Sequence, residues 1–293
     1  MTISDRFQSV TTSIAESAMT SHIAKAATAP PTQTAAASFP GSSRTETFMG
    51  RPVTIEIRTP LPARELTPLM DDAFAWLRWV EDTFSPSKED SQITRLNRGL
   101  TLKQVPELIE VLHRCDELSE ATGGWFDARI NGVTDPSGYV KGWALERLSR
   151  ALLQAGAGDH RITAGNDVRV RGSHAPGRRG RVPVPDPRTG KIRRTVLAHD
   201  LGIATSGGSR VLDPHTGEVR DTLGSVTVIG PDLGMADAYA TAMYAMGPIQ
   251  ARRFASELAA KGSYETLIVL HDGQELATPG FAVYDDRRTR LAG

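Results

Sequence analysis

Hydrophobic side chains recur along the chain at two spacings, and each spacing predicts one kind of element. Apolar and polar residues alternate over residues 53–57, as in a half-buried strand, and apolar positions recur at helical spacing over residues 65–82. A second helix is expected over residues 106–122, because Pro106 suits a first helical turn and two glycines follow the segment. The pattern therefore predicts a strand followed by two packed helices.

The second half of the chain mixes both spacings. Helices are expected over residues 139–156 and 236–246, and strands over residues 226–229 and 267–270. Residues 174–194 are crowded with arginine, glycine and proline, so they are expected to form a long connection between short strands, with its charges solvated. Because strands and helices do not follow a regular βαβ cadence, the expected class is α+β, with mixed sheets and packed helices.

Composition limits the partners and the compartment of the chain. Its 293 residues hold 34 Lys plus Arg against 34 Asp plus Glu, so no overall field draws it to nucleic acid. No stretch is apolar enough to predict a membrane-spanning segment, and charged residues interrupt any secretory pattern, so a cytoplasmic location is expected. The Ala-, Ser- and Thr-rich residues 1–45 are expected to be a mostly disordered tail, followed by one domain over residues 46–293. The single cysteine, Cys115, lies at an apolar position of the second helix and is expected in the core.

Two oxygen-bearing side chains share one face of the helix expected over residues 236–246. Asp237 and Thr241 are four residues apart, so a carboxylate and a hydroxyl project together and could bind one hard cation. The alternative is that an aspartate near a helix start serves as a cap or interacts with the helix dipole. The spacing alone leaves both interpretations open.

The polar loop before the helix over residues 139–156 is a second candidate. Asp135 could accept hydrogen bonds from a ribose or a base, the Gly138 carbonyl could approach a cation, and Lys141 lies where helix N–H groups favour phosphate. A common turn with a solvated lysine would explain the same residues. Upstream, Phe126 and Asp127 could flank a flat ring, although Trp125 and Phe126 are more often core residues.

Further candidates lie in small polar segments that are expected to be loops. Residues 204–208 and 212–217 favour turns, and they would allow close backbone approach to a ligand. His215 lies in the second of these segments and could be a general base, but a lone turn histidine is more often only exposed.

Taken in chain order, eight segments resemble the ApbE-like family of FAD:protein FMN transferases over about residues 48–247. The segments that carry the resemblance are Phe48-Met49-Gly50, Asp90 to Asn97, Gly124-Trp125-Phe126-Asp127, Asp135 to Gly142, Ala164-Gly165-Asn166-Asp167, Ala204-Thr205-Ser206-Gly207, Asp213-Pro214-His215-Thr216-Gly217 and Ala236 to Ala242.

This resemblance implies a flavin pocket and a metal site. The residues implied to line the FAD pocket are Met49, Trp125, Phe126, Asp127, Asp135 and Lys141. Mg²⁺ would be bound by the Asp237 carboxylate, the Thr241 hydroxyl and the Gly138 carbonyl, an all-oxygen set that suits Mg²⁺ better than Zn²⁺. Asp237, through the metal, and Lys141 are the implied catalytic residues, because pyrophosphate cleavage needs electrostatic stabilisation and alignment.

The implied reaction transfers FMN from FAD to a threonine or serine hydroxyl of an acceptor flavoprotein in a redox or electron-transfer system, and releases AMP. Two alternatives stay open, namely hydrolysis of FAD to FMN and AMP, and flavin binding without turnover.

The chain departs from the family pattern at three positions near the implied ligand. Arg210 stands where members usually have a histidine before the Asp-Pro-x-Thr-Gly turn, in a shortened segment. Ser87 stands where many members have a tyrosine, and Gly165-Asn166 replaces a double glycine. If the histidine helps to deprotonate the acceptor, its loss implies slow or absent transfer.

Overall fold

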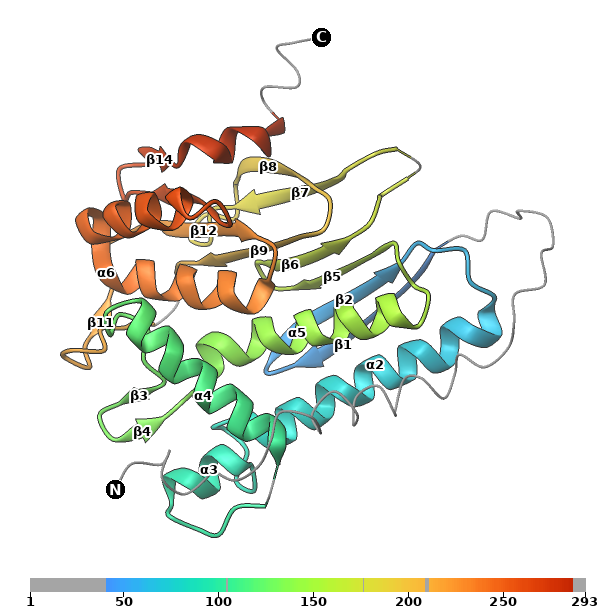
Figure 1. Ribbon diagram of the computed structural model, residues 1–293, viewed down its shortest axis with the longest axis horizontal. Coiled ribbons are helices and arrows are strands. Elements are labelled where there is room, and N and C mark those ends of the chain that lie inside the picture. The colour runs from blue at the N-terminus through green and yellow to red at the C-terminus, as the bar shows by residue number, and fades with distance from the viewer. Residues whose placement is uncertain (1–40, 104, 176, 209–210, 287–293) are drawn as a thin grey trace.

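An antiparallel sheet forms the centre of the protein. The computed structural model describes residues 41–103, 105–175, 177–208 and 211–286, and within them eight strands pair in the order β1-β2-β5-β6-β9-β12-β13-β14 (Figure 1). Every neighbouring pair is antiparallel. The strands are β1 (Ser42–Phe48), β2 (Arg51–Ile57), β5 (His160–Ala164), β6 (Asp167–Arg171), β9 (Leu201–Ser206), β12 (Ser225–Gly230), β13 (Glu265–Val269) and β14 (Glu275–Ala277).

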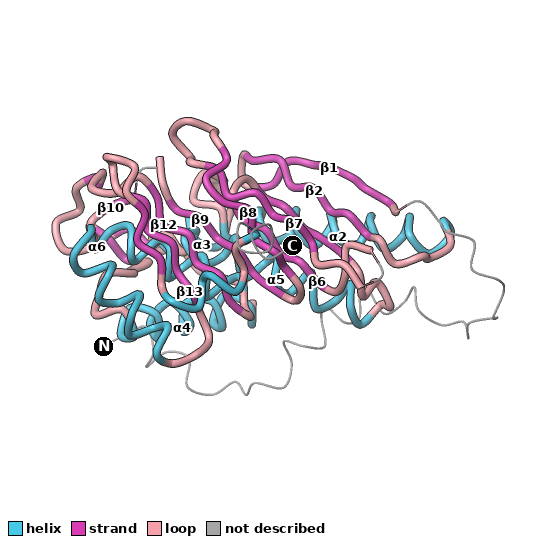
Figure 2. Tube along the Cα trace, turned by 90° about the horizontal axis from the view of Figure 1, so that it is seen from above, coloured by secondary structure: helices cyan, strands magenta, loops and turns pink. Residues whose placement is uncertain are grey.

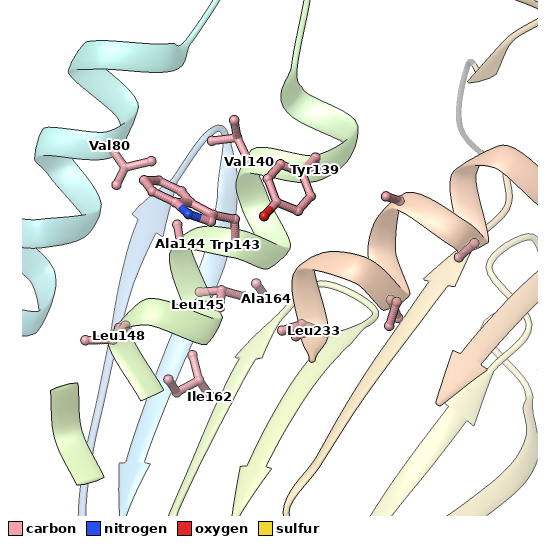
Figure 3. Packing of buried hydrophobic residues seen from close by; sticks show 14 of the residues in the cluster. Val80, Tyr139, Val140, Trp143, Ala144, Leu145, Leu148, Ile162, Ala164 and Leu233 are labelled. Atoms are coloured by element: carbon pink, nitrogen blue, oxygen red, sulfur yellow. The ribbon is translucent and has the colours of Figure 1, made fainter. Parts of the chain in front are cut away.

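Helices cover one face of this sheet, as the view from above shows (Figure 2). They are α2 (Ala63–Phe84), α4 (Pro106–Ala121), α5 (Ser137–Gln154) and α6 (Leu233–Ala260), with the short α3 (Gln92–Asn97) after α2. Apolar side chains of α5 pack between α2 and the sheet, and Trp143 lies at this junction (Figure 3). Its ring centroid is 5.6 Å from that of Trp76, and its indole N–H donates to Glu110 at 3.0 Å. Trp143 therefore connects α5 to α2 through Trp76 and to α4 through Glu110.

A β-hairpin covers part of the opposite face. It pairs β7 (Gly180–Pro185) with β8 (Ile192–Ala198), and η3 (Pro279–Val283) packs in the same layer. The expected long connection over residues 174–194 is therefore wrong in its second part. Val182 and Val184 are buried at a spacing of two, and arginine and proline residues between and around them hide this alternation in the sequence.

The charges of that segment are also less solvated than expected. Arg193 pairs with Asp186 at 2.7 Å, and Arg194 and Arg181 pair with Glu275 and Asp286. The first pair lies within the hairpin, and the other two tie the hairpin to the C-terminal part of the described chain.

Two smaller hairpins lie near the N-terminal end of α5. They are β3 (Arg129–Ile130) with β4 (Val133–Thr134), and β10 (Val211–Leu212) with β11 (Val219–Arg220). They touch where Gly217 meets Asn131, since a Cβ atom on Gly217 would lie 2.2 Å from the Asn131 side chain.

The α+β class is confirmed, and the expected helices are present. Helix α5 begins two residues earlier than expected, so Gly138 lies in its first turn rather than in a loop. Helix α6 breaks at Gly247, whose φ of 74° is left-handed, and Pro248 follows the break. Residues 204–206 were expected to form a loop, but they are buried at the end of β9.

Three other expectations concern burial and the termini. Cys115 is buried, as expected, and burial raises the pKa of its thiol to about 12. β1 begins at Ser42, inside the segment expected to be a tail, and residues 1–40 lie outside the described residues. Among the described helices none combines the length and apolarity needed to cross a bilayer.

Candidate functional site

Three charged side chains from α5, β6 and α6 meet at one end of the sheet. The Lys141 Nζ atom lies 2.6 Å from Asp167 Oδ2 and 3.5 Å from Asp237 Oδ2. Both aspartates are buried, whereas the Lys141 side chain is 28% exposed. We call these three residues the lysine cluster. One lysine thus faces two carboxylates, and the cluster opens to solvent on the lysine side.

Glycines let the helices approach closely enough to form this cluster. A Cβ atom on Gly142 would lie 2.7 Å from the Leu233 carbonyl oxygen and 2.9 Å from the Gly234 Cα atom. The backbones of α5 and α6 are therefore in contact, and the Gly142 N–H hydrogen bonds to the Asp237 carboxylate. The close crossing is what brings Asp237 of α6 next to Lys141 of α5.

Asp167 is fixed from the other side. It begins β6, directly after the turn Gly165-Asn166, and its Oδ1 atom accepts the N–H of Thr205 on β9 at 3.1 Å. Gly165 has a left-handed φ of 60°, which the turn requires and which glycine adopts without strain. The neighbouring strand therefore orients one oxygen of Asp167 and leaves the other for Lys141.

Charge in the cluster is not fully compensated. Burial raises the pKa of Asp237 above its usual range, and Lys141 offsets only part of this effect. Burial also disfavours the charge of Lys141, but Asp167 and Asp237 outweigh it and raise the pKa of the lysine. Within the described chain the Asp237 Oδ2 atom is buried and has no hydrogen-bond partner. Lys141 Nζ lies 3.5 Å away, an ion pair that is too long for a good hydrogen bond. A buried carboxylate oxygen without a hydrogen bond is costly, so it marks a place where a ligand would be stabilised.

Thr241, one of the residues expected to bind a metal, lies on α6 beside Gly138 of α5. Thr241 is one turn after Asp237, and a Cβ atom on Gly138 would lie 3.8 Å from the Thr241 hydroxyl. Asp237 is not the cap of α6, because Asp232 accepts the Met235 N–H at 3.0 Å. The Ser206 hydroxyl adds a further oxygen, 3.3 Å from that of Thr241.

These residues fit one hard cation with only part of its shell supplied by protein. The donors would be a carboxylate, hydroxyls and a carbonyl, which suit Mg²⁺. No group of three or more His, Cys, Asp or Glu side chains suited to a metal is present in the described ranges. A bound Mg²⁺ would therefore have to complete its shell with ligand or water oxygens.

The aromatic candidates lie beside the lysine cluster, on the segment that follows α4. Phe126 is buried, and its ring edge would be 3.3 Å from a Cβ atom on Gly138. Trp125 is half-buried, with its ring centroid 4.5 Å from that of His215, and the Arg220 guanidinium lies 5.8 Å from the Trp125 ring centroid. The His215 side chain is exposed, as expected, and one side of its ring packs against Trp125.

The remaining candidates have local roles in the structure. Asp127 and Asp135 each accept a backbone N–H two residues later, from Arg129 at 2.7 Å and from Ser137 at 3.0 Å. Met49 forms the β1–β2 turn with a left-handed φ of 48° and packs half-buried against the core. Their contacts with FAD stay predictions.

Sequence reasoning did not assign a site role to Asp167, Ser206 or Arg220. Asp167 and Ser206 lie inside segments that carry the family resemblance, but the resemblance gave neither residue a function. Nothing in the sequence pattern pointed to Arg220, because it is the pairing of β10 with β11 that places this residue beside Trp125. Arg210, the residue at the expected histidine position, lies outside the described residues. Ser87 is exposed in the segment after α2.

Known proteins match both the sequence and the fold. The sequence model of the ApbE family matches residues 49–135 and 133–265. The FAD:protein FMN transferases of Klebsiella pneumoniae (strain 342) and Escherichia coli (strain K12) are 30% and 31% identical over 138 and 133 residues. These segments cover 42% and 40% of this chain, and they span only 39% and 38% of those two proteins.

Two solved structures share the architecture. The flavin transferase ApbE from Vibrio cholerae superposes with a TM-score of 0.72 at 19% identity, over 84% of this chain and 100% of that one. The ApbE protein from Thermotoga maritima gives a TM-score of 0.75 at 21% identity, over 84% and 99% of the two chains. The family model covers well over half of the sequence, and this chain belongs to the ApbE family.

Proposed function

We propose that this protein is a Mg²⁺-dependent FAD:protein FMN transferase, in which the lysine cluster holds the metal and the pyrophosphate of FAD. The observation that supports this most directly is the buried Asp237 Oδ2 atom, which lacks a hydrogen-bond partner and lies 3.5 Å from Lys141 Nζ. The relatives named FAD:protein FMN transferase support the choice of substrate.

In this proposal Asp237, Thr241 and the Gly138 carbonyl bind the metal. Bound there, Mg²⁺ would neutralise charge that develops on the phosphoryl oxygens. Lys141 extends from the first turns of α5, so its ammonium and the positive end of the helix dipole would face the same phosphates. Asp167 acts as a positioning residue, because its 2.6 Å ion pair with Lys141 holds the ammonium in place.

The aromatic residues after α4 would bind the flavin side of the substrate. Phe126 lies against Gly138, and Trp125 is half-buried with Arg220 near its face. Met49, Asp127 and Asp135 complete the proposed pocket. A flat ring bound against Trp125 would gain contact area with an aromatic face.

The proposed reaction exchanges one phosphate ester bond for another. A threonine or serine hydroxyl of the acceptor forms a new P–O bond to the FMN phosphorus, the bond to the AMP oxygen breaks, and the hydroxyl proton passes to the leaving phosphate or to solvent. We expect the acceptor to be a flavoprotein of a redox or electron-transfer system, and we expect the reaction to take place in the cytoplasm.

The test is AMP release from FAD by the purified protein, with and without Mg²⁺ and with and without a candidate acceptor flavoprotein. Transfer predicts Mg²⁺-dependent AMP release that requires the acceptor, together with covalent flavin fluorescence on the acceptor after denaturing electrophoresis. Asp237→Asn should lower the rate by about 10²–10³-fold, the cost of losing one strong electrostatic contact in a reaction of this kind. Asp272→Asn, in an exposed turn, is the matched control and should leave the rate unchanged.

The same assay separates the two alternatives. Mg²⁺-dependent AMP release at the same rate without an acceptor would replace transfer by FAD hydrolysis. Saturable FAD binding without AMP release under any condition, including with an unmodified acceptor that a known transferase can flavinylate, would replace catalysis by flavin binding.

A further inference from the structure

A cavity lies at the opposite end of the sheet from the lysine cluster. It has a volume of about 250 Å³, and five of its nine lining residues are arginines. The polar lining side chains are Arg58, His174, Arg161, Arg178, Arg179 and Arg181. The lining also includes Val170 and Val182, which belong to the core between the sheet and the β7–β8 hairpin. The cavity therefore opens on the sheet face that the helices do not cover.

The strand register keeps this cavity apart from the lysine cluster. β2 runs from Arg51, which lies beside Gly165 near the lysine cluster, to Ile57, and Arg58 follows directly. Seven residues of extended chain correspond to about 23 Å. Figure 1 shows β2, β5 and β6 running side by side between the two ends. A ligand in this cavity would not touch Lys141 or Asp237.

Positive charge in the cavity exceeds the carboxylates available to neutralise it. Glu56 lies 2.9 Å from Arg58 and 3.9 Å from Arg161, and Asp286 pairs with Arg181. Arg178 and Arg179 are exposed and have no ion pair within the described ranges, and none of the nine lining residues is acidic. On a chain whose formal net charge is zero, this is a local concentration of guanidinium groups.

One of these arginines is incompletely bonded, and the charge of a second is disfavoured by burial. The Arg58 Nη1 atom is buried without a hydrogen-bond partner in the described part of the chain. Arg161 uses its Nε atom for Thr163 at 3.2 Å. Burial lowers the pKa of Arg161, Glu56 offsets part of this effect, and the charge of Arg58 lowers the pKa further. An anion in the cavity would supply acceptors and reduce this repulsion.

The lining favours phosphate over other anions. Guanidinium groups form paired hydrogen bonds to phosphate oxygens, and arginines from two strands and two loops could surround a tetrahedral group. No Phe, Tyr or Trp of the described residues lines the cavity, so the wall consists mainly of groups that bind anions. At about 30 Å³ per water-sized group, 250 Å³ has room for a diphosphate.

We propose that this arginine-lined cavity is a binding site for a phosphate-bearing anion, separate from the site at Lys141 and Asp237. The probe is inorganic diphosphate, titrated calorimetrically into the full chain in the presence of EDTA, so that no divalent metal assists binding at Asp237. We expect saturable binding that weakens with added salt, because it depends on charge.

Variants assign the binding to the cavity. The exposed pair Arg178→Gln/Arg179→Gln should weaken diphosphate binding by at least about tenfold, the cost of losing charge-assisted hydrogen bonds. Arg161→Gln should have a similar effect, with a thermal unfolding midpoint measured in parallel. The matched control is Arg64→Gln/Arg252→Gln, which removes the same charge from exposed helix positions and should leave binding unchanged.

Lys141→Ala should retain diphosphate binding, because that residue lies at the other end of the sheet. Loss of binding in Lys141→Ala, or unchanged binding in Arg178→Gln/Arg179→Gln, would overturn the proposal, and so would citrate binding as tightly as diphosphate.

Flotation with phosphatidylcholine vesicles, with and without phosphatidic acid, separates the sources of phosphate. Vesicle binding that is lost in the arginine pair would identify a lipid headgroup, whereas binding of diphosphate alone would identify a free phosphate compound.

Discussion

Two buried charge clusters occupy the same interface between α5, β6 and α6, and they differ in what they leave unpaired. The lysine cluster has one cation and two carboxylates, with Asp237 Oδ2 lacking a hydrogen-bond partner. The second, which we call the glutamate cluster, comprises Glu146, Arg169 and Arg171. Glu146 lies 3.0 Å from Arg169 and 3.2 Å from Arg171, and it accepts the Leu233 N–H at 3.0 Å.

The difference separates a candidate binding site from an ion-pair cluster that only holds elements together, which we call a brace. In the glutamate cluster the carboxylate contacts two arginines and the start of α6, so it connects three elements. Within the described ranges, the buried atoms without a hydrogen-bond partner there are guanidinium nitrogens of Arg169 and Arg171, not carboxylate oxygens. In the lysine cluster the surplus is negative, and solvent reaches it past a partly exposed lysine. A carboxylate whose oxygens are both engaged holds its partners in place, whereas a buried carboxylate oxygen without a hydrogen bond is suited to a cation.

Glu146→Gln tests the brace and should have the largest effect on stability. It would leave the Arg169 guanidinium, which is 1% exposed, without its carboxylate partner. We expect a loss of about 3–5 kcal/mol in the free energy of unfolding, measured by urea denaturation. Glu257→Gln, in an exposed helix pair with Arg253, should cost less than about 0.5 kcal/mol. Equal losses in both variants would remove the distinction between a brace and a surface pair.

A pH titration should show the second-largest effect, next to the same brace. His160 is buried, its Nδ1 atom donates to the Ala157 carbonyl at 2.6 Å, and its Nε2 atom accepts from the Ser149 hydroxyl at 2.8 Å. Burial lowers the pKa of His160 from 6.5 to about 4, helped by Arg171 and Arg169, although the Ala157 carbonyl and Asp159 oppose the shift.

Because the folded pKa is below the unfolded one, the unfolded state binds the proton first as pH falls. Stability is complete above pH 6.5 and should decrease by about 3 kcal/mol between pH 6.5 and pH 4 through this group. Urea midpoints of the wild type and His160→Gln across this range isolate the contribution. The control is His113→Gln, whose side chain is 70% exposed. Parallel pH profiles for wild type and His160→Gln would show that His160 does not cause the loss of stability.

Gly142→Ala tests whether the close helix crossing assembles the lysine cluster. The added Cβ atom would meet the Leu233 backbone at 2.7 Å, so α5 and α6 must separate. We expect a loss of about 1–3 kcal/mol in unfolding free energy, with weaker FAD binding in the same protein. Gly158→Ala is the control, because its Cβ atom would have only an ordinary contact with Leu153 at 3.8 Å. Full FAD affinity in Gly142→Ala would show that the crossing does not control the site.

Much of the fold could be predicted from local pattern, because local pattern determines helices. The spacing of apolar residues predicts α2, and Pro106 with the glycines after residue 122 predicts both ends of α4. The β7–β8 hairpin could not be recognised in the same way. Its buried positions, such as Val182 and Val184, are separated by Pro183 and bordered by arginines, so composition concealed a spacing of two.

The site was predictable only in part, because its parts come from distant segments. The spacing of Asp237 and Thr241 places both on one helix face, and the family resemblance adds Gly138 and Lys141. The ion pair between Lys141 and Asp167 depends on which strand lies under α5, and the Asp237 environment depends on a glycine contact between two helices. Neither is encoded in a local pattern.

Asp237→Asn should change stability least, although it removes a proposed metal ligand. Burial already raises the pKa of this carboxylate, so its charge is costly, and the amide would remove that cost together with the attraction to Lys141. We expect the unfolding free energy to change by less than about 1 kcal/mol. At the same time Mg²⁺ plus FAD should raise the thermal midpoint of the wild type but not of the variant, because a ligand stabilises only the state that binds it. A stability loss as large as that of Glu146→Gln would mean that the lysine cluster is a second brace, and an unchanged response to Mg²⁺ and FAD would place the metal elsewhere.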